Sequence, residues 1–436
     1  MLRNGQRQYC AAKVLKKHHP APGISLIIWL AAFLQGLAAS APAQTWTNVT
    51  SYSVPPGSDP WGITVGPDGA VWFTAYANNQ IGRMNGPGAI TEYPLPTFTQ
   101  PFASEPYGIT AGPDGALWFT ELQGNQIGRI TTAGVVTQYP LPTVGSEPQG
   151  IAAGPDGALW FTEWSGNKIG HITTSGVITE YPLPTANSGP AGITAGPNGA
   201  LWFTEWSGTR IGSITTSGVI TEYPVPTANS YPAGITAGPD GALWFTEYYG
   251  NKIGSITTSG VIAEYPVPTS SCYPLGIAAG PDGALWFAES GADQIGRIVT
   301  SGLITEYPVP GQGLGPGFIA GGTTGLWFTE WEANQIGRAP ACGLGFSASF
   351  ASRTLTLNFE LGITTPAIWY GTLTTSTGVA KQLWSYTIPA KVPPAPVTLT
   401  YGPGFPNLGE VTIVAGLETA AGTDLCYETA TANTAP

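Results

Sequence analysis

Three acidic residues precede a proline in the first three of a series of similar loops, as Asp59-Pro60-Trp61, Glu105-Pro106-Tyr107 and Glu147-Pro148-Gln149. Carboxylate oxygens suit Mg²⁺ or Ca²⁺, although carbonyls or water would have to complete the coordination shell. The aromatic residues beside them could stack on an apolar or sugar ring. The alternative is that the three acids are solvated loop residues. We therefore hypothesise a site that binds a small molecule, a glycan or a protein. The residues of this site are Asp59, Trp61, Glu105, Tyr107, Glu147 and Gln149.

A second set of carboxylates recurs at the end of one predicted strand in six repeats. An active site needs one or two placed acids, so six equivalent ones indicate a structural role. We expect each to cap its own loop by accepting backbone N–H bonds, because buried loop donors normally find acceptors. A cation or sugar site is the alternative. The set is Glu121, Glu163, Glu205, Glu247, Glu289 and Glu330, with Trp164, Trp206, Tyr248 and Trp331 following four of them.

A repeat that occurs seven times must position these residues. Each copy holds four short β-rich segments separated by turn residues, and a chain with Gly 60 and Pro 41 excludes helical repeats of this length. Four strands and this period are typical of a β-propeller blade. Equivalent isoleucines mark the copies at steps of 46 and then 42 residues: Ile63, Ile109, Ile151, Ile193, Ile235, Ile277 and Ile319.

Two turn motifs sort the loops between the faces of the ring. Gly-Pro-Asp-Gly, as at Gly154 to Gly157, and Thr-Thr-Ser-Gly, as at Thr173 to Gly176, close antiparallel hairpins on one face. The loops after the repeated glutamates and the linkers between blades then lie on the other face. These are longer and more variable, so we expect this face to carry function.

The ends of the array predict how the ring closes. The seventh copy stops after its third strand near Arg338, and Thr47 to Val54 resembles a lone fourth strand. We therefore predict an all-β, seven-bladed propeller over residues 44–340 that is closed by the N-terminal strand. Alternating segments such as Ser347 to Phe359 predict a small β-sandwich-like domain over residues 341–436.

The first 43 residues are typical of a signal peptide, with cleavage before Gln44. Five basic residues precede an apolar run from Ile24 to Ala39 and the small residues Ala41-Pro42-Ala43. An uncleaved membrane anchor is the alternative, because the apolar run is close to the shortest that spans a bilayer. Either way the protein is expected outside the cytoplasm, secreted or periplasmic.

Removal of this segment changes the net charge from −11 to −16, because it carries five basic residues and no acidic ones. A strongly negative protein is an unsuitable partner for nucleic acid. Cations, neutral ligands and basic proteins stay possible partners. A membrane is a partner only if the N-terminal segment is retained. We expect the protein to be a monomer. In the exported chain, Cys342 and Cys426 are the preferred disulfide, which leaves Cys272 unpaired; the other two pairings stay open.

The repeated motifs resemble the virginiamycin B lyase family over Thr45 to Arg338. They are Gly-Ile-Thr-Ala-Gly-Pro-Asp-Gly-Ala-Leu-Trp-Phe-Thr-Glu at residues 234–247, Ile-Gly-Arg-Ile at 127–130 and Ile-Thr-Glu-Tyr-Pro-Leu-Pro at 178–184. The resemblance implies a seven-bladed propeller. It also implies that active members open streptogramin B rings by Mg-assisted elimination, without water or a redox cofactor, so Mg²⁺ is a possible cofactor.

In active members the working histidines lie between Pro and Gly or Ala at the mouth of particular blades. The matching positions here are Trp61, Tyr107, Gln149, Ala191, Ala233, Leu275 and Gly317, none of them histidine. The exported chain has only His171, which replaces the Arg of Ile-Gly-Arg.

Elimination requires a base, so we assign no catalytic residue and favour a non-catalytic propeller that binds a ligand or partner. The alternatives are a carbon-oxygen lyase in which Glu105 or Glu147, with a raised pKa, replaces the histidines, and a purely structural surface protein.

Overall fold

The computed structural model describes residues 49–339, except 87, 97–103, 281–282 and 323–324, and the backbone of seven strands between residues 345 and 433. The predicted signal peptide lies outside this part. Within the described ranges, no helix is long and apolar enough to cross a membrane.

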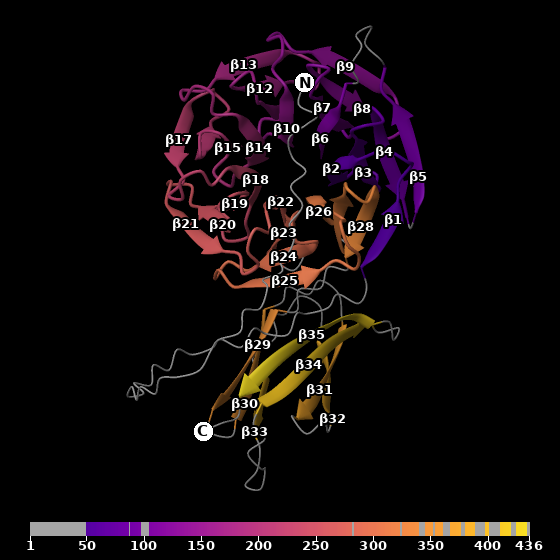
Figure 1. Cartoon of the computed structure of the whole chain (residues 1–436), viewed down its shortest axis with the longest axis vertical. Coiled ribbons are helices and arrows are strands. Elements are labelled where there is room, and N and C mark those ends of the chain that lie inside the picture. The colour runs from indigo at the N-terminus through magenta and orange to yellow at the C-terminus, as the bar shows by residue number, and fades with distance from the viewer. Residues whose placement is uncertain are drawn as a thin grey trace, which may run out of the picture. The chain divides into compact units, whose positions relative to one another are not determined.

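Seven four-stranded antiparallel sheets form the ring in Figure 1, which confirms the predicted propeller. Blades 1 to 3 are β2 (Pro60–Val65), β3 (Val71–Ala75), β4 (Gln80–Asn85), β5 (Ala89–Pro94); β6 (Pro106–Ala111), β7 (Leu117–Glu121), β8 (Gln126–Ile130), β9 (Val136–Pro140); and β10 (Pro148–Ala153), β11 (Leu159–Glu163), β12 (Lys168–Ile172), β13 (Ile178–Pro182). Blades 4 and 5 are β14 (Pro190–Ala195), β15 (Leu201–Glu205), β16 (Arg210–Ile214), β17 (Ile220–Pro224); and β18 (Pro232–Ala237), β19 (Leu243–Glu247), β20 (Lys252–Ile256), β21 (Ile262–Pro266). Blades 6 and 7 are β22 (Pro274–Ala279), β23 (Leu285–Glu289), β24 (Gln294–Ile298), β25 (Ile304–Pro308); and β26 (Pro316–Gly322), β27 (Gly325–Glu330), β28 (Gln335–Ala339) with β1 (Thr50–Ser53).

The second strand of each blade is apolar on both faces because it lies between two neighbouring blades. Side chains of a strand alternate between its faces. In blade 4, Trp202 therefore packs against Phe245 of the following blade, whereas Phe203 packs against Trp160 of the preceding one. All four Trp and Phe rings of these two contacts are essentially inaccessible to solvent. Burying one Phe side chain stabilises the fold by about 1.5–3 kcal/mol. Because these rings lie between neighbouring blades, the core is a series of interfaces between blades.

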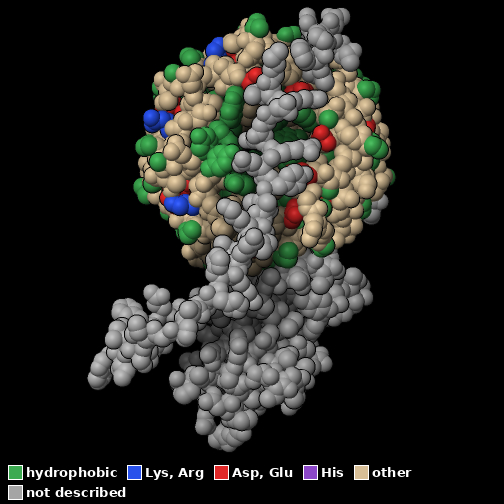
Figure 2. Space-filling model, viewed as in Figure 1, with side chains coloured by type: hydrophobic (Ala, Val, Ile, Leu, Met, Phe, Trp, Pro, Cys, Tyr) green, Lys and Arg blue, Asp and Glu red, His purple; other side chains and the backbone are tan. Residues whose placement is uncertain are grey.

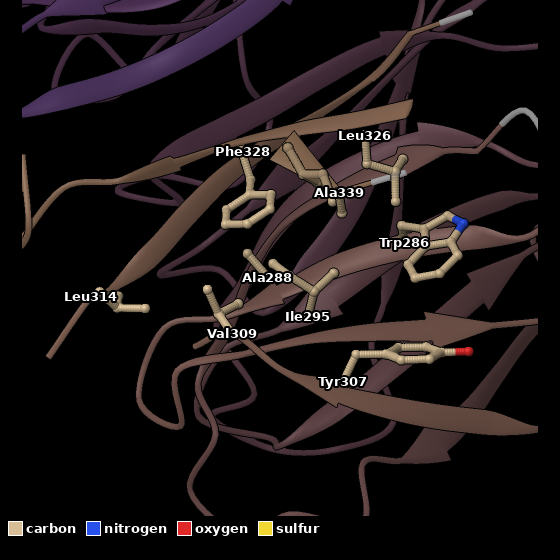
Figure 3. Close-up of a cluster of buried hydrophobic side chains, with 10 residues drawn as sticks. Trp286, Ala288, Ile295, Tyr307, Val309, Leu314, Leu326, Phe328 and Ala339 are labelled. Atoms are coloured by element: carbon tan, nitrogen blue, oxygen red, sulfur yellow. The ribbon is translucent and has the colours of Figure 1, made fainter. Parts of the chain in front are cut away.

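Figure 3 shows one of these interfaces, between blades 6 and 7. Trp286 and Ile295 of blade 6 point toward Leu326 and Phe328 of blade 7. The inner strands approach even more closely: a Cβ atom at Gly192 would lie 2.6 Å from the carbonyl oxygen of Ala233 in the next blade. Glycine is therefore required where the inner strands surround the channel.

The N-terminal strand closes the ring, as the sequence predicted. β1 pairs antiparallel with β28, with Thr50 opposite Arg338 and Ser53 opposite Gln335. The side-chain amide of Asn334 also donates to the carbonyl oxygens of Val54 (3.0 Å) and Pro55 (2.8 Å). Residues near the two ends of the repeat array therefore complete one blade, which removes an unpaired sheet edge.

The C-terminal strands form two antiparallel sheets. One has the order β29 (Gly345–Ala351), β30 (Thr354–Glu360), β33 (Val397–Thr400); the other β32 (Ala380–Ile388), β31 (Ala367–Thr375), β34 (Glu410–Thr419), β35 (Asp424–Asn433). The packing of these sheets as a sandwich stays a prediction. So does the Cys342–Cys426 disulfide, because the first cysteine and the side chain of the second lie outside the described part. Cys272 is a free, buried thiol.

Candidate ligand site at the propeller mouth

A central cavity of about 290 Å³ lies where the inner strands begin. All seven inner strands contribute to its wall, and the wall is mainly aromatic or apolar. Inner-strand residues with side chains beyond Cβ in the lining are Trp61, Tyr107, Gln149, Leu275 and Phe318. The volume is at the lower end of the range of about 300–1,000 Å³ that is usual for small-molecule sites.

Buried threonines hold the mouth residues in place. The hydroxyl of Thr204, on the second strand of blade 4, accepts from the backbone N–H of Gly192 (2.9 Å) and donates to the carbonyl of Ala233 in blade 5 (2.7 Å). Each such hydroxyl therefore links the inner strands of two neighbouring blades. The same donation joins Thr74 to Tyr107, Thr120 to Gln149, Thr162 to Ala191 and Thr246 to Leu275. The cavity wall is thus built on a rigid ring.

Three of the predicted site residues, Trp61, Tyr107 and Gln149, line the cavity. The rings of Trp61 and Tyr107 are 5.4 Å apart, and Phe318 of blade 7 lies 5.7 Å from Trp61. The predicted site was confined to the first three blades. The cavity instead lies at the centre, because the inner strand of every blade begins at the channel.

The three predicted acids, Asp59, Glu105 and Glu147, are not among the residues that line the cavity. Each has a left-handed backbone conformation, with φ of 46°, 53° and 51°. Glu105 accepts a 2.6 Å hydrogen bond from the hydroxyl of Tyr76, and Glu147 accepts one of 2.5 Å from Ser165. Asp59 stays exposed. We call Asp59, Glu105 and Glu147 the acidic side of the mouth.

Mg²⁺, which the sequence resemblance implies, has no matching ligand set in the described residues. They contain no group of three or more His, Cys, Asp or Glu side chains that could hold a metal ion. Asp59, Glu105 and Glu147 therefore do not form the three-carboxylate cation site considered from the sequence, because each follows a separate linker and contacts its own neighbours.

Three further aromatic residues line the cavity from the loops after the second strands: Trp164, Trp206 and Tyr248. Each directly follows a repeated glutamate, and from the sequence these residues were named only in the alternative cation or sugar site, which was not the favoured interpretation. Because side chains alternate along a strand end, the glutamate turns into the blade while the next residue faces the mouth. The alternation was the signal that could have identified them.

The aromatic residues continue beyond the cavity over blades 4 to 6. Trp206 lies 5.5 Å from Tyr231 and 5.2 Å from Tyr248, measured between ring centroids, and Tyr248 stacks on Tyr273 at 5.2 Å. Tyr249, which is 52% exposed, lies 5.0 Å from Tyr231. We call Trp164, Trp206, Tyr231, Tyr248, Tyr249 and Tyr273 the aromatic side of the mouth.

The two sides are separated on the surface. In Figure 2, hydrophobic side chains gather beside the centre of the ring over the region that Figure 1 labels β14, β15 and β18. Acidic side chains follow the opposite inner rim, over the strands of the first two blades.

The prediction that the repeated glutamates cap their loops is wrong. The six carboxylates are fully buried, and among the described residues no backbone N–H donates to those of Glu163, Glu205, Glu247 and Glu289. The polar groups beside these four are linker side chains, namely Ser146, Ser188, Ser230 and Cys272. Asparagines four positions later cap the linkers instead, because their short side chains reach the linker backbone. Asn167 accepts from the N–H of Ser188 (2.8 Å) and donates to the carbonyl of Thr185 (2.9 Å).

Four of these glutamates face a second glutamate on the fourth strand of the same blade. The pairs are Glu163 with Glu180, Glu205 with Glu222, Glu247 with Glu264, and Glu289 with Glu306. Burial, and then the charge of Glu264, raise the pKa of Glu247 to about 8. Although burial opposes the change, hydrogen bonds from Lys252 and Thr227 lower the pKa of Glu264. Near neutral pH each pair is therefore expected to retain a proton on its inner member.

Blades 2 and 7 place a neutral donor where the other blades have the second glutamate. In blade 2 the amides of Gln126 (2.7 Å) and Gln138 (3.0 Å) donate to Glu121. In blade 7 the hydroxyl of Ser51, on the closing strand, donates to Glu330 (2.8 Å). The chain thus contains its own comparison between buried carboxylates that face a neutral donor and buried carboxylates that face a second glutamate.

His171 replaces an arginine on a third strand, as expected. Its Nε2 atom lies 3.3 Å from Asp156 of the Gly-Pro-Asp-Gly turn. Arg129 contacts Asp114 of the corresponding turn in blade 2 at 2.7 Å. These turns lie at the opposite ends of the strands from the mouth, so His171 is not part of the candidate site.

Comparison with known proteins gives a consistent family assignment. The sequence model of the virginiamycin B lyase family matches residues 42–187 and 102–347. A curated virginiamycin B lyase of Staphylococcus aureus is 55% identical over 38 residues, which span 9% of this chain and 13% of that protein.

Solved structures match the whole propeller. A selenomethionine-substituted virginiamycin B lyase from S. aureus is 45% identical, with a TM-score of 0.65, over 68% of this chain and 99% of that chain. A catalytically inactive histidine-to-alanine variant of that lyase, solved with quinupristin, is 44% identical with a TM-score of 0.65 over the same shares of the two chains. A streptogramin B lyase is 42% identical with a TM-score of 0.64, covering 68% of this chain and 99% of that chain.

Proposed function

The chain belongs to the virginiamycin B lyase family, and from this premise we propose that it is an exported, non-catalytic member whose propeller binds a small molecule at the mouth. The composition of the cavity wall is the observation that carries the proposal. Six aromatic rings line it, from Trp61, Tyr107, Trp164, Trp206, Tyr248 and Phe318. Such a wall suits an apolar ring system.

The chemistry of the wall argues against the family reaction. Elimination needs a base that is deprotonated near neutral pH. Among the described lining residues, the titratable side chains are Tyr107 and Tyr248. Burial raises the pKa of Tyr107 to about 12 and also raises that of Tyr248. Neither phenol would accept a proton at pH 7, and the histidine positions hold Trp, Tyr, Gln, Ala, Leu or Gly.

Incubation with quinupristin and Mg²⁺ tests the absence of catalysis. Chromatography separates intact from ring-opened antibiotic, and the S. aureus lyase serves as the positive control. We expect quinupristin to stay intact with this protein. Ring opening at an enzymatic rate would overturn the proposal in favour of a lyase with altered catalytic residues, and loss of that activity in Glu105→Gln or Glu147→Gln would then identify the base.

Binding is tested separately from turnover. Titration with single-ring and two-ring aromatic compounds should change tryptophan fluorescence, because three tryptophans and two tyrosines line the cavity. Trp206→Ala should weaken the response. Fluorescence that does not change with any of these compounds would contradict a ring-binding cavity.

Export is the second part of the proposal. It is supported by the basic, apolar and small-residue order of residues 1–43. N-terminal sequencing of the native protein should find Gln44 first. A retained Met1 together with membrane fractionation would indicate an anchor instead.

A further inference from the structure

We propose that the ligand of the mouth is an organic cation that carries an apolar ring, with the ring against the aromatic side and the positive charge toward the acidic side. This inference rests on the proposed ligand-binding function and adds the chemical class of the ligand. It follows from the cavity and from how the side chains around it are distributed.

The aromatic side favours both parts of such a ligand. Trp164 and Trp206 lie 6.0 Å apart and Trp206 and Tyr248 5.2 Å apart, so ring surface continues along the wall of the cavity. Apolar rings stack on this surface, and the negative faces of aromatic rings attract cations. An anion would gain the first contribution but would be repelled by the second.

The acidic side of the mouth is connected to the cavity wall through Tyr76. Tyr76 donates to Glu105 at 2.6 Å, and its ring lies 6.4 Å from that of Trp61, which lines the cavity. Glu105 and Glu147 both stand two residues before a cavity residue, Tyr107 and Gln149 respectively. Their hydrogen-bond donors are hydroxyl groups, which carry no positive charge. The field at this side of the cavity is therefore negative.

Four of the positive side chains in the described part of the propeller are engaged elsewhere. Arg83 and Arg129 pair with Asp68 and Asp114 in the turns of the opposite face. Lys168 and Lys252 pair with Glu180 and Glu264 on the outer strands. The described cavity lining has no Lys, Arg or His. A cation entering the mouth would meet aromatic faces and carboxylates without a competing positive charge.

Three probes with the same ring and different charges test the proposal: benzyltrimethylammonium, benzyl alcohol and phenylacetate. Their dissociation constants are measured on the purified protein by fluorescence and by ligand-observed NMR at low ionic strength. We expect the cation to bind most tightly and the anion most weakly, with about a tenfold difference in Kd between them. Added salt should narrow this difference.

Substitutions separate the contributions of the two sides. Glu105→Gln with Glu147→Gln should reduce the difference between cation and anion while benzyl alcohol binds as before. Trp206→Ala should weaken all three probes. Asp240→Asn is the matched control, because it removes a carboxylate on the opposite face where blade 4 already has Asn198. It should leave all three Kd values unchanged.

Equal binding of the three probes would overturn the cation preference and leave the ligand-binding function standing. Tighter binding of benzyl alcohol than of the cation would do the same and would point to a neutral ligand such as a sugar. If none of the probes binds, the proposal and the function on which it rests both fail.

Discussion

The blade interiors and the mouth of the channel differ in how strictly they repeat. The second strand reads Leu-Trp-Phe-Thr-Glu in five of the blades, and its side chains are buried except for the half-buried Trp327 of blade 7. At the mouth, equivalent positions hold Trp61, Tyr107, Gln149, Ala191 and Leu275. Interior positions must fit two neighbouring blades at once, whereas a mouth side chain enters open space. In this chain, a residue type that is repeated from blade to blade therefore indicates packing between blades. A position whose residue type varies between blades is one that is free to contact a ligand.

The largest effect should come from breaking the interior at the closing strand. Deleting Thr50–Ser53 removes the pairing with β28, the bond from Ser51 to Glu330 and the cover of a sheet edge. We expect thermal unfolding, followed by circular dichroism, to begin at a much lower temperature.

Deleting residues 97–100 is the matched control. It removes the same number of residues and shortens the first repeat spacing from 46 to the common 42. This deletion should leave the midpoint nearly unchanged. Equal midpoints for the parent and the Thr50–Ser53 deletion would contradict closure by the N-terminal strand.

The next effect is a fall in stability as pH rises. Burial raises the pKa of Glu163, Glu205 and Glu330 to about 7 and that of Glu247 and Glu289 to about 8. The folded protein then binds more protons than the unfolded chain between their pKa values, so stability is full below about 4.5 and is lost as pH rises through 7 to 8.

The pH dependence is measured as the unfolding midpoint from pH 3 to pH 9. It should be highest near pH 5 and at least about 10 °C lower at pH 9. Below pH 4 it should fall again, because Asp68 and Asp114 have lowered pKa values and lose their contribution when protonated. A midpoint that rises from pH 5 to pH 9 would contradict buried, protonated glutamates.

A reciprocal exchange between blades sharpens the comparison within the interior. Glu247→Gln replaces a carboxyl that must lose its proton at pH 9, so it should stabilise the protein there by about 3 kcal/mol and have little effect at pH 5. Gln138→Glu gives blade 2 the pair found in blade 5 and should destabilise at pH 9. Denaturant unfolding at both pH values measures the two changes; the same sign for both at pH 9 would contradict the pairing.

The smallest effect on stability is expected at the mouth. Glu105→Gln and Glu147→Gln change side chains that are only half-buried, so the free energy of unfolding should stay within about 0.5 kcal/mol of the parent. These substitutions should alter ligand binding instead. Calorimetry that showed a binding loss for Glu205→Gln and Glu247→Gln, but not for these two, would reverse the assignment of the two carboxylate sets.

The sequence by itself determined the ring. Seven copies of one pattern, turn residues at fixed offsets and a lone fourth strand near the N-terminus specify blades, faces and closure, because each of these depends on contacts within a repeat or between neighbours. The replacement of an arginine by His171 could likewise be understood from the sequence, since its partner Asp156 belongs to the same blade.

Only the tertiary structure decided what the repeated and varied positions contact. Whether Glu163 faces a loop or the fourth strand depends on the twist of the sheet, and the structure places it beside Glu180 while Asn167 caps the linker. Whether the mouth residues meet depends on the width of the channel. That width brings Phe318 of the seventh blade to within 5.7 Å of Trp61 of the first, a contact between residues far apart in sequence that no local pattern encodes.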